Sequence, residues 1–193
     1  SYAYGGEIES SDMAQKAVMD KLPIAAMIIM VLLMSQFKSL RRTGLILITI
    51  PLAIIGVVFG LFITQSYFGF MTYLGVISLT GIVINIAIIL IERIEYELDV
   101  TKLDPKDAII EAAQRRMRPI MLTTLTTIGG LLPLWFAGGP LWEPMAIAII
   151  FGLGFATILT LGIVPIFYSI IFGIKYPKEY RFIYLDQCVL DRK

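Results

Sequence analysis

The residues of this sequence that could take part in chemistry are a few polar side chains inside long uncharged runs. Asn85 lies in the uncharged run of residues 43–91, and Ser78, seven positions earlier, falls on the same helical face. The next uncharged run holds four closely spaced threonines: Thr123, Thr124, Thr126 and Thr127. Polar side chains are costly in apolar surroundings, so these residues are the first candidates for function. The pattern predicts a polar seam between two helices of a bundle.

Two interpretations of this seam stay open on spacing alone. Thr123 and Thr127 are four positions apart and share a face of their helix, while Glu92 continues the Asn85 face to the end of its run. Such side chains can hold helices together, at about 0.6 to 2 kcal/mol for each interhelical hydrogen bond. Alternatively, they take part in an ion path.

Several kinds of chemistry have no support in the sequence. The uncharged runs contain no Asp, Glu, Lys, Arg or His, so they offer no group that takes up a proton at membrane depth. There is no phosphate-binding Gly-Lys-Ser/Thr pattern, no histidine and a single cysteine, Cys188. These features argue against ATP hydrolysis and against bound metal. We therefore expect a protein that is not an enzyme, with no cofactor and no metal site.

The placement of charge predicts the elements that carry the polar residues. Hydrophobic residues make up 58% of the 193, and the 16 basic and 15 acidic residues avoid four long runs. A water-soluble domain is excluded, because its helices and strands need a polar face. About 20 mostly apolar residues cross the hydrocarbon core as a helix. The sequence thus predicts an all-α integral membrane protein with spans at about residues 22–37, 44–64, 68–91, 119–136 and 144–174.

The basic residues also predict an orientation. Loops on one side carry fourteen Lys and Arg residues and those on the other side carry two, so the tail of residues 175–193 is expected in the cytoplasm. With five spans, the N-terminus then lies outside. Residues 1–21 are polar, begin without Met and show no signal-peptide pattern. We expect them to be the exit from an outer soluble domain, and the chain to be the C-terminal part of a longer polypeptide. The alternative is a small protein with a translocated N-terminus or a cleaved signal.

The segment before the fourth span predicts an amphipathic helix on the membrane surface, over residues 104–117. Asp104 suits the N-cap and Pro105 the first helical position. An apolar stripe and a basic end follow, formed by Ile109, Ala112, Ala113 and Met117 and by Arg115, Arg116 and Arg118.

Several stretches, in this order and spacing, resemble the C-terminal half of resistance–nodulation–division (RND) efflux permeases of the hydrophobe/amphiphile type. They cover roughly residues 5–175. The sequences that carry the resemblance are Gly6-Glu7, Gln36-Phe37-Lys38-Ser39, Ile50-Pro51-Leu52, the run from Gly81 to Glu92, Arg116-Met117-Arg118-Pro119-Ile120, Thr123-Thr124, Gly129-Gly130-Leu131-Leu132-Pro133-Leu134, Pro144-Met145-Ala146 and Val164-Pro165.

The resemblance implies a bacterial inner-membrane permease of twelve spans, built from two six-span halves with large periplasmic domains. Its members use proton antiport to export hydrophobic or amphiphilic compounds and confer multidrug resistance. The implied partners are the N-terminal half of the same permease, two further copies in a homotrimer, a periplasmic adaptor, an outer-membrane channel and the lipid bilayer, with no nucleic acid. The five spans here would be half of a twelve-span transmembrane domain, with the N-terminus periplasmic.

The resemblance also implies roles for single residues. Many drug pumps have a lysine at the position of Asn85, which here can form a hydrogen bond but cannot supply a cation. Thr123 matches a threonine of the proton relay, and Arg116 matches an arginine near its cytoplasmic mouth. Glu92 matches an acidic position for which an interfacial cap is preferred over a relay role. The proton-carrying aspartates of such pumps lie in the half that this sequence does not include.

Two other functions fit the same residues. A membrane scaffold or accessory subunit would also lack a titratable group, and Gly56 and Gly60 form a GxxxG pattern that suits helix association. An RND exporter of lipids would share this half with a drug pump. A long upstream reading frame with intramembrane aspartates would favour the pump, and a start codon near Ser1 would favour the scaffold.

Overall fold

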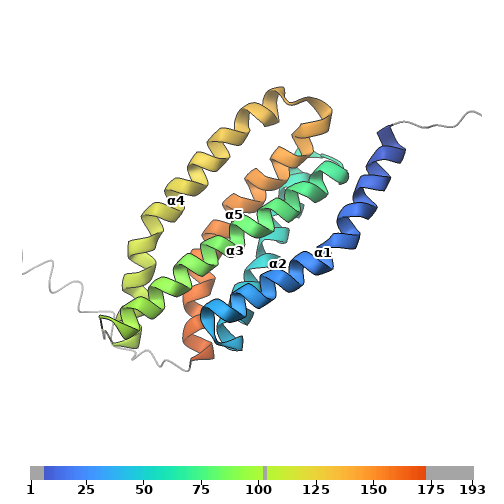
Figure 1. Ribbon diagram of the computed structural model, residues 1–193. Coiled ribbons are helices and arrows are strands. Elements are labelled where there is room, and N and C mark those ends of the chain that lie inside the picture. Colours follow the sequence, from blue (N-terminus) through green and yellow to red (C-terminus); the bar gives the residue numbers. More distant parts are fainter. Residues whose placement is uncertain (1–6, 102–103, 173–193) are drawn as a thin grey trace, which may run out of the picture.

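The computed structural model describes residues 7–101 and 104–172, and these fold into five long helices without a strand (Figure 1). The helices are α1 (Glu7–Phe37), α2 (Leu40–Thr64), α3 (Phe70–Asp99), α4 (Pro105–Ala137) and α5 (Gly139–Ile171). All five are long and apolar enough to cross a membrane. The all-α membrane fold with five long apolar helices is therefore confirmed. The predicted tail of residues 175–193 and its basic residues lie outside the described residues.

Helix α5 is the centre of the bundle. It packs against α2, α3 and α4, and its buried residues are spaced along nearly its whole length. Helix α1 joins the others near its C-terminal end, where Leu33 and Phe37 are buried against α2 and α3. Between residues 13 and 36, most of the other apolar side chains of α1 are exposed. The chain is thus a bundle around α5 with one peripheral helix.

Helices α2 and α5 approach each other closely because α2 has glycines where they meet. A Cβ atom on Gly56 would lie 2.6 Å from Cβ of Phe155 and 3.0 Å from the backbone oxygen of Phe151. Gly60 faces Phe151 in the same way, and on the other side Gly152 faces Val57. The GxxxG pattern therefore serves packing inside this bundle, as small residues commonly do between membrane helices.

The structure differs from the expected surface helix over residues 104–117. These residues are the first part of α4, which continues without a break through Pro119 to Ala137. Ala108, Ile109 and Ala112 are buried, and Ile109 and Ala112 belong to an apolar cluster with residues of α2, α3 and α5. The apolar stripe packs against the end of the bundle, because contact with neighbouring helices removes its side chains from water as effectively as contact with lipid would. Met117, at the end of the stripe, is exposed.

Candidate functional site

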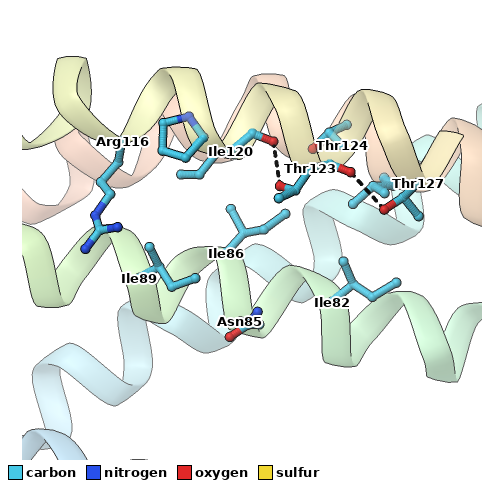
Figure 2. A pocket seen from close by; sticks show the side chains of 11 residues that line it. Ile82, Asn85, Ile86, Ile89, Arg116, Ile120, Thr123, Thr124 and Thr127 are labelled. Atoms are coloured by element: carbon cyan, nitrogen blue, oxygen red, sulfur yellow. Dashed lines mark hydrogen bonds between the residues drawn. The ribbon is translucent and has the colours of Figure 1, made fainter. Parts of the chain in front are cut away.

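A pocket of about 180 Å³ lies between α3 and α4, and one residue of α5 contributes to its lining (Figure 2). Its lining is mixed, with isoleucines from α3 and polar side chains mainly from α4. The residues are Ile82, Asn85, Ile86 and Ile89 of α3, Arg116, Pro119, Ile120, Thr123, Thr124 and Thr127 of α4, and Leu153 of α5. The structure thus brings Asn85, Arg116, Thr123 and Thr127 around one cavity.

Asn85 faces the pocket from α3 without a hydrogen-bonding partner in the described part of the chain. Its side chain is exposed, so its amide can both donate and accept a hydrogen bond toward whatever fills the open side. Gly81, one turn earlier, is also exposed, and a Cβ atom there would meet nothing within 4 Å. This face of α3 therefore offers an amide beside open space.

The hydroxyls of Thr123 and Thr127 donate their protons within α4 itself. Thr123 Oγ1 donates to the carbonyl oxygen of Ile120 at 2.9 Å, and Thr127 Oγ1 donates to that of Thr123 at 2.8 Å. Each hydroxyl oxygen keeps acceptor capacity that can face the cavity. The two sides of the seam are close enough to share a pocket, yet no side-chain hydrogen bond joins Asn85 to these threonines.

Of three further residues of the expected seam, one lines the cavity and two do not. Arg116 lies at the end of the pocket nearest the α3–α4 connection, across from Ile89 (Figure 2). Ser78 and Glu92 are exposed on α3 and do not line the cavity. Residues seven positions apart, such as Ser78, Asn85 and Glu92, differ in direction by only about 20° on a straight helix. The cavity is short, however, and it borders only the middle of this face.

A buried hydroxyl pair behind the pocket joins α4 to α5. Thr124 Oγ1 and Thr157 Oγ1 are 2.9 Å apart, and Thr157 Oγ1 also lies 2.7 Å from the carbonyl oxygen of Leu153. Both side chains are at most 5% exposed. The sequence pointed to Thr124 as one of four threonines, but it did not point to Thr157. The available signal was two threonines, Thr157 and Thr160, in an otherwise apolar run.

We expect this pair to contribute modestly to stability. Thr124→Val and Thr157→Val keep the shape of the side chain and remove the hydroxyl. In a double-mutant cycle on the purified chain in detergent, the coupling free energy should be about 0.6 kcal/mol and below about 2 kcal/mol. Steric trapping or thermal unfolding measures it, and strictly additive effects would contradict a direct interaction.

The fold is that of a multi-pass membrane protein: it has five membrane-length helices and a pocket with polar side chains between two of them. Polar side chains at membrane depth are common on the pathways of transporters. The chain belongs to the AcrB/AcrD/AcrF family, whose model matches residues 1–172. These are RND permeases, so the resemblance in the sequence is confirmed at the level of that class.

Named relatives support the same class. The chain is 34% identical over 151 residues to the swarming motility protein SwrC of Bacillus subtilis, covering 76% of the chain and 14% of the relative. It is 31% identical over 165 residues to the nickel and cobalt resistance protein CnrA of Cupriavidus metallidurans, covering 84% and 15%. The multidrug resistance protein MdtC of Proteus mirabilis is 33% identical over 148 residues, covering 75% and 14%.

A solved structure has the same fold. The crystal structure of a heavy metal efflux pump superposes with a TM-score of 0.74 at 32% sequence identity, covering 87% of this chain and 17% of that chain. The chain therefore spans less than a fifth of the length of the relatives it matches. Relatives named for metals and for multiple drugs both occur, so the hydrophobe/amphiphile type is not confirmed.

Proposed function

We propose that these helices belong to the transmembrane domain of an RND exporter driven by the proton-motive force. The observation that carries the proposal is the half-open pocket in which Asn85, Thr123, Thr127 and Arg116 meet. Polar side chains around a cavity are costly in an apolar bundle unless another group uses them. Interhelical hydrogen bonding alone does not explain it, since Asn85 has no partner among the described residues.

The pocket can shape a proton path without storing the proton. Asn85 has no titratable proton, and the threonine hydroxyls stay neutral at any physiological pH. A carboxyl group supplied from outside this chain would exchange hydrogen bonds with the Asn85 amide and the Thr123 hydroxyl on gaining or losing its proton. The membrane potential supplies about 2.3 kcal/mol for each charge moved through 100 mV. The exchange of hydrogen bonds at Asn85 and Thr123 would shift α3 against α4, and this shift would drive the export cycle.

The proposal includes a setting and partners. The chain would lie in the bacterial inner membrane, with residues 1–21 leaving a periplasmic region, the N-terminus periplasmic and residues 175–193 cytoplasmic. The N-terminal half of the permease would cover the open side of the pocket. A homotrimer, a periplasmic adaptor and an outer-membrane channel would complete the assembly.

The test is proton flux through the full-length permease reconstituted in vesicles. Asn85→Ala and Thr123→Ala should each lower substrate-coupled proton flux about tenfold, because one lost hydrogen bond in the seam is worth about 1.4 kcal/mol. Thr126→Ala is the matched control, since Thr126 Oγ1 bonds the carbonyl oxygens of Leu122 and Thr123 and does not line the pocket. Undiminished flux in both seam variants would refute the role of the pocket. Absence of coupled flux in the wild type would favour the scaffold.

For the cargo, we infer hydrophobic or amphiphilic compounds. Heavy-metal cations are the second candidate, because CnrA carries nickel and cobalt resistance in its name and the superposed structure is of a heavy metal efflux pump. The same vesicles distinguish the two. Proton flux stimulated by an amphiphilic dye and not by Ni²⁺ or Co²⁺ supports the first, and the reverse result replaces it with the second. A lipid exporter would respond to neither.

A further inference from the structure

A buried carboxylate lies at the end of α3, outside the pocket. Glu97 is 1% exposed, although it stands in the last turn of the helix among exposed residues such as Tyr96 and Asp99. A carboxylate without solvent persists where cations and hydrogen-bond donors replace the water. Nothing in the sequence pattern marks this position as buried, because charged residues surround it on both sides.

The partners of Glu97 come from three consecutive segments. Arg93, one turn earlier on α3, donates through Nη2 to Oε1. Thr101, in the connection to α4, donates from Oγ1 to Oε2 at 2.7 Å. Arg115 of α4 brings Nε within 3.7 Å of Oε1. Glu97 therefore ties the end of α3 to the connection and to α4.

The contact with Arg115 bears directly on the pocket, because the next residue of α4 is Arg116. Neighbours on a helix differ by about 100° in direction and 1.5 Å in height. A restraint on Arg115 thus limits the rotation of α4 next to Arg116, which lines the cavity (Figure 2). Glu111 also bonds Arg115, but it lies on α4 itself and cannot fix α4 relative to α3.

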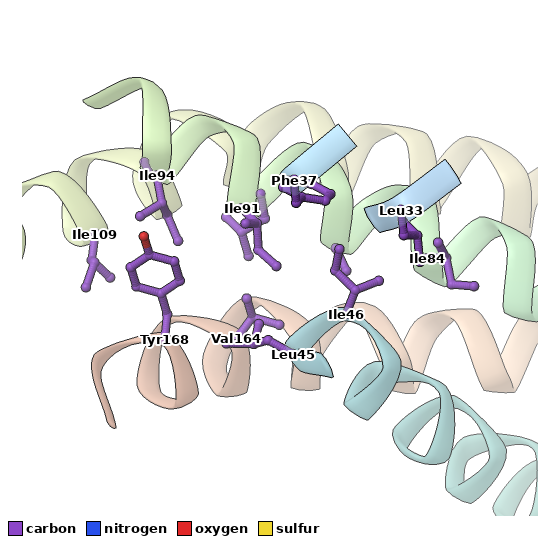
Figure 3. Close-up of a cluster of buried hydrophobic side chains, with 13 residues drawn as sticks. Leu33, Phe37, Leu45, Ile46, Ile84, Ile91, Ile94, Ile109, Val164 and Tyr168 are labelled. Atoms are coloured by element: carbon purple, nitrogen blue, oxygen red, sulfur yellow. The ribbon is translucent and has the colours of Figure 1, made fainter. Parts of the chain in front are cut away.

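Apolar packing alone does not supply this restraint. Ile94 of α3 and Ile109 of α4 belong to one buried cluster near this end (Figure 3). Contacts of this kind are not directional, so they allow small rotations. Beyond Ala112, the buried residues of α4 are Ile120 and Thr124. Among the described residues, the ion pair between Glu97 and Arg115 is the charged contact that joins α3 to α4 at the height of Arg115.

We propose that Glu97 is a positioning residue for the seam: through Arg115 it holds Arg116 at the mouth of the pocket. The expected effect on transport rests on the proposed function. The expected effect of Glu97 on the position of α4 relative to α3 does not. Removing the charge of Glu97 should loosen α4 against α3 at this end and displace Arg116, while the substrate site elsewhere in the permease stays intact.

The transport arm compares Glu97→Gln with Glu111→Gln in the reconstituted full-length permease. We expect Glu97→Gln to lower the maximal rate about tenfold to hundredfold, as misplacement of a functional group does, without changing the half-saturating substrate concentration. Glu111→Gln should stay within about twofold of the wild type, because exposed pairs within one helix contribute little. Arg116→Gln and the double variant Glu97→Gln/Arg116→Gln should have the same rate. Equal losses at Glu97 and Glu111, or multiplying losses at Glu97 and Arg116, would overturn the proposal.

The distance arm needs no transport. Spin labels at Asp99→Cys and Gln114→Cys, with the native cysteines replaced by serine, report the α3–α4 distance in the same full-length permease. The distribution should broaden with Glu97→Gln and remain narrow with Glu111→Gln, and an unchanged distribution overturns the positioning role even where no proton-coupled transport is found. If Glu97→Gln does not fold, Arg115→Gln makes the same comparison, since the Arg115 side chain is 57% exposed.

Discussion

Gly56→Ala is expected to destabilise the bundle by about 1 to 3 kcal/mol. The added methyl group would lie 2.6 Å from Cβ of Phe155, 3.0 Å from the backbone oxygen of Phe151 and 3.1 Å from Cα of Gly152. None of these atoms is the far end of a flexible side chain, so α2 and α5 must separate. Because α5 also packs against α3 and α4, the separation would disturb the whole bundle.

The matched control is Gly44→Ala on the same helix. A Cβ atom at Gly44 meets nothing within 4 Å, so alanine there should be neutral or stabilising by up to about 1 kcal/mol through its better helix propensity. Steric trapping or thermal unfolding of the purified chain in detergent compares the two. The two substitutions should differ clearly in their effect on the free energy of unfolding. Equal effects of both would contradict the close approach of α2 and α5.

The second large effect is expected at Gly81, on the open face of α3. In the purified 193-residue chain, Gly81→Leu should leave the unfolding temperature within a few degrees, since nothing lies within 4 Å of its Cβ position. In the full-length permease, the same leucine should lower transport at least about tenfold. A helix from the rest of the permease that covers the pocket would meet the new side chain, and small residues are what permit such close approach.

Gly162→Leu is the control for this comparison. Gly162, on α5, is likewise exposed with no atom within 4 Å of its Cβ position, but it lies on another helix, whereas Gly81 lies on α3 one turn from the pocket residue Asn85. Its leucine variant should transport at the wild-type rate. Normal transport by Gly81→Leu would mean that no helix closes the seam at this height, and would contradict the proposal that another part of the permease covers the pocket.

Four of the residues that line the pocket could be predicted from the sequence. Asn85, Thr123, Thr127 and Arg116 are conspicuous because polar side chains are rare in or beside uncharged runs, and helical periodicity places Thr123 and Thr127 on one face. Ser78 and Glu92 follow the same periodicity, yet the cavity does not reach them. Periodicity gives the direction of a side chain, whereas the extent of a cavity depends on where a second helix approaches.

The placement of charged and apolar residues by itself determined that this is an all-α membrane protein with five long helices. The thickness of the hydrocarbon core fixes the length of each span, and the local composition shows where each span lies. Three other features depend on contacts between residues far apart in the sequence, so only the tertiary structure reveals them. It joined the expected surface helix to α4, since Ile109 and Ala112 find a buried site on neighbouring helices. It paired Thr124 with Thr157 across 33 positions. It also buried Glu97, whose contact with Arg115 of another helix could not be predicted from its neighbours in the sequence.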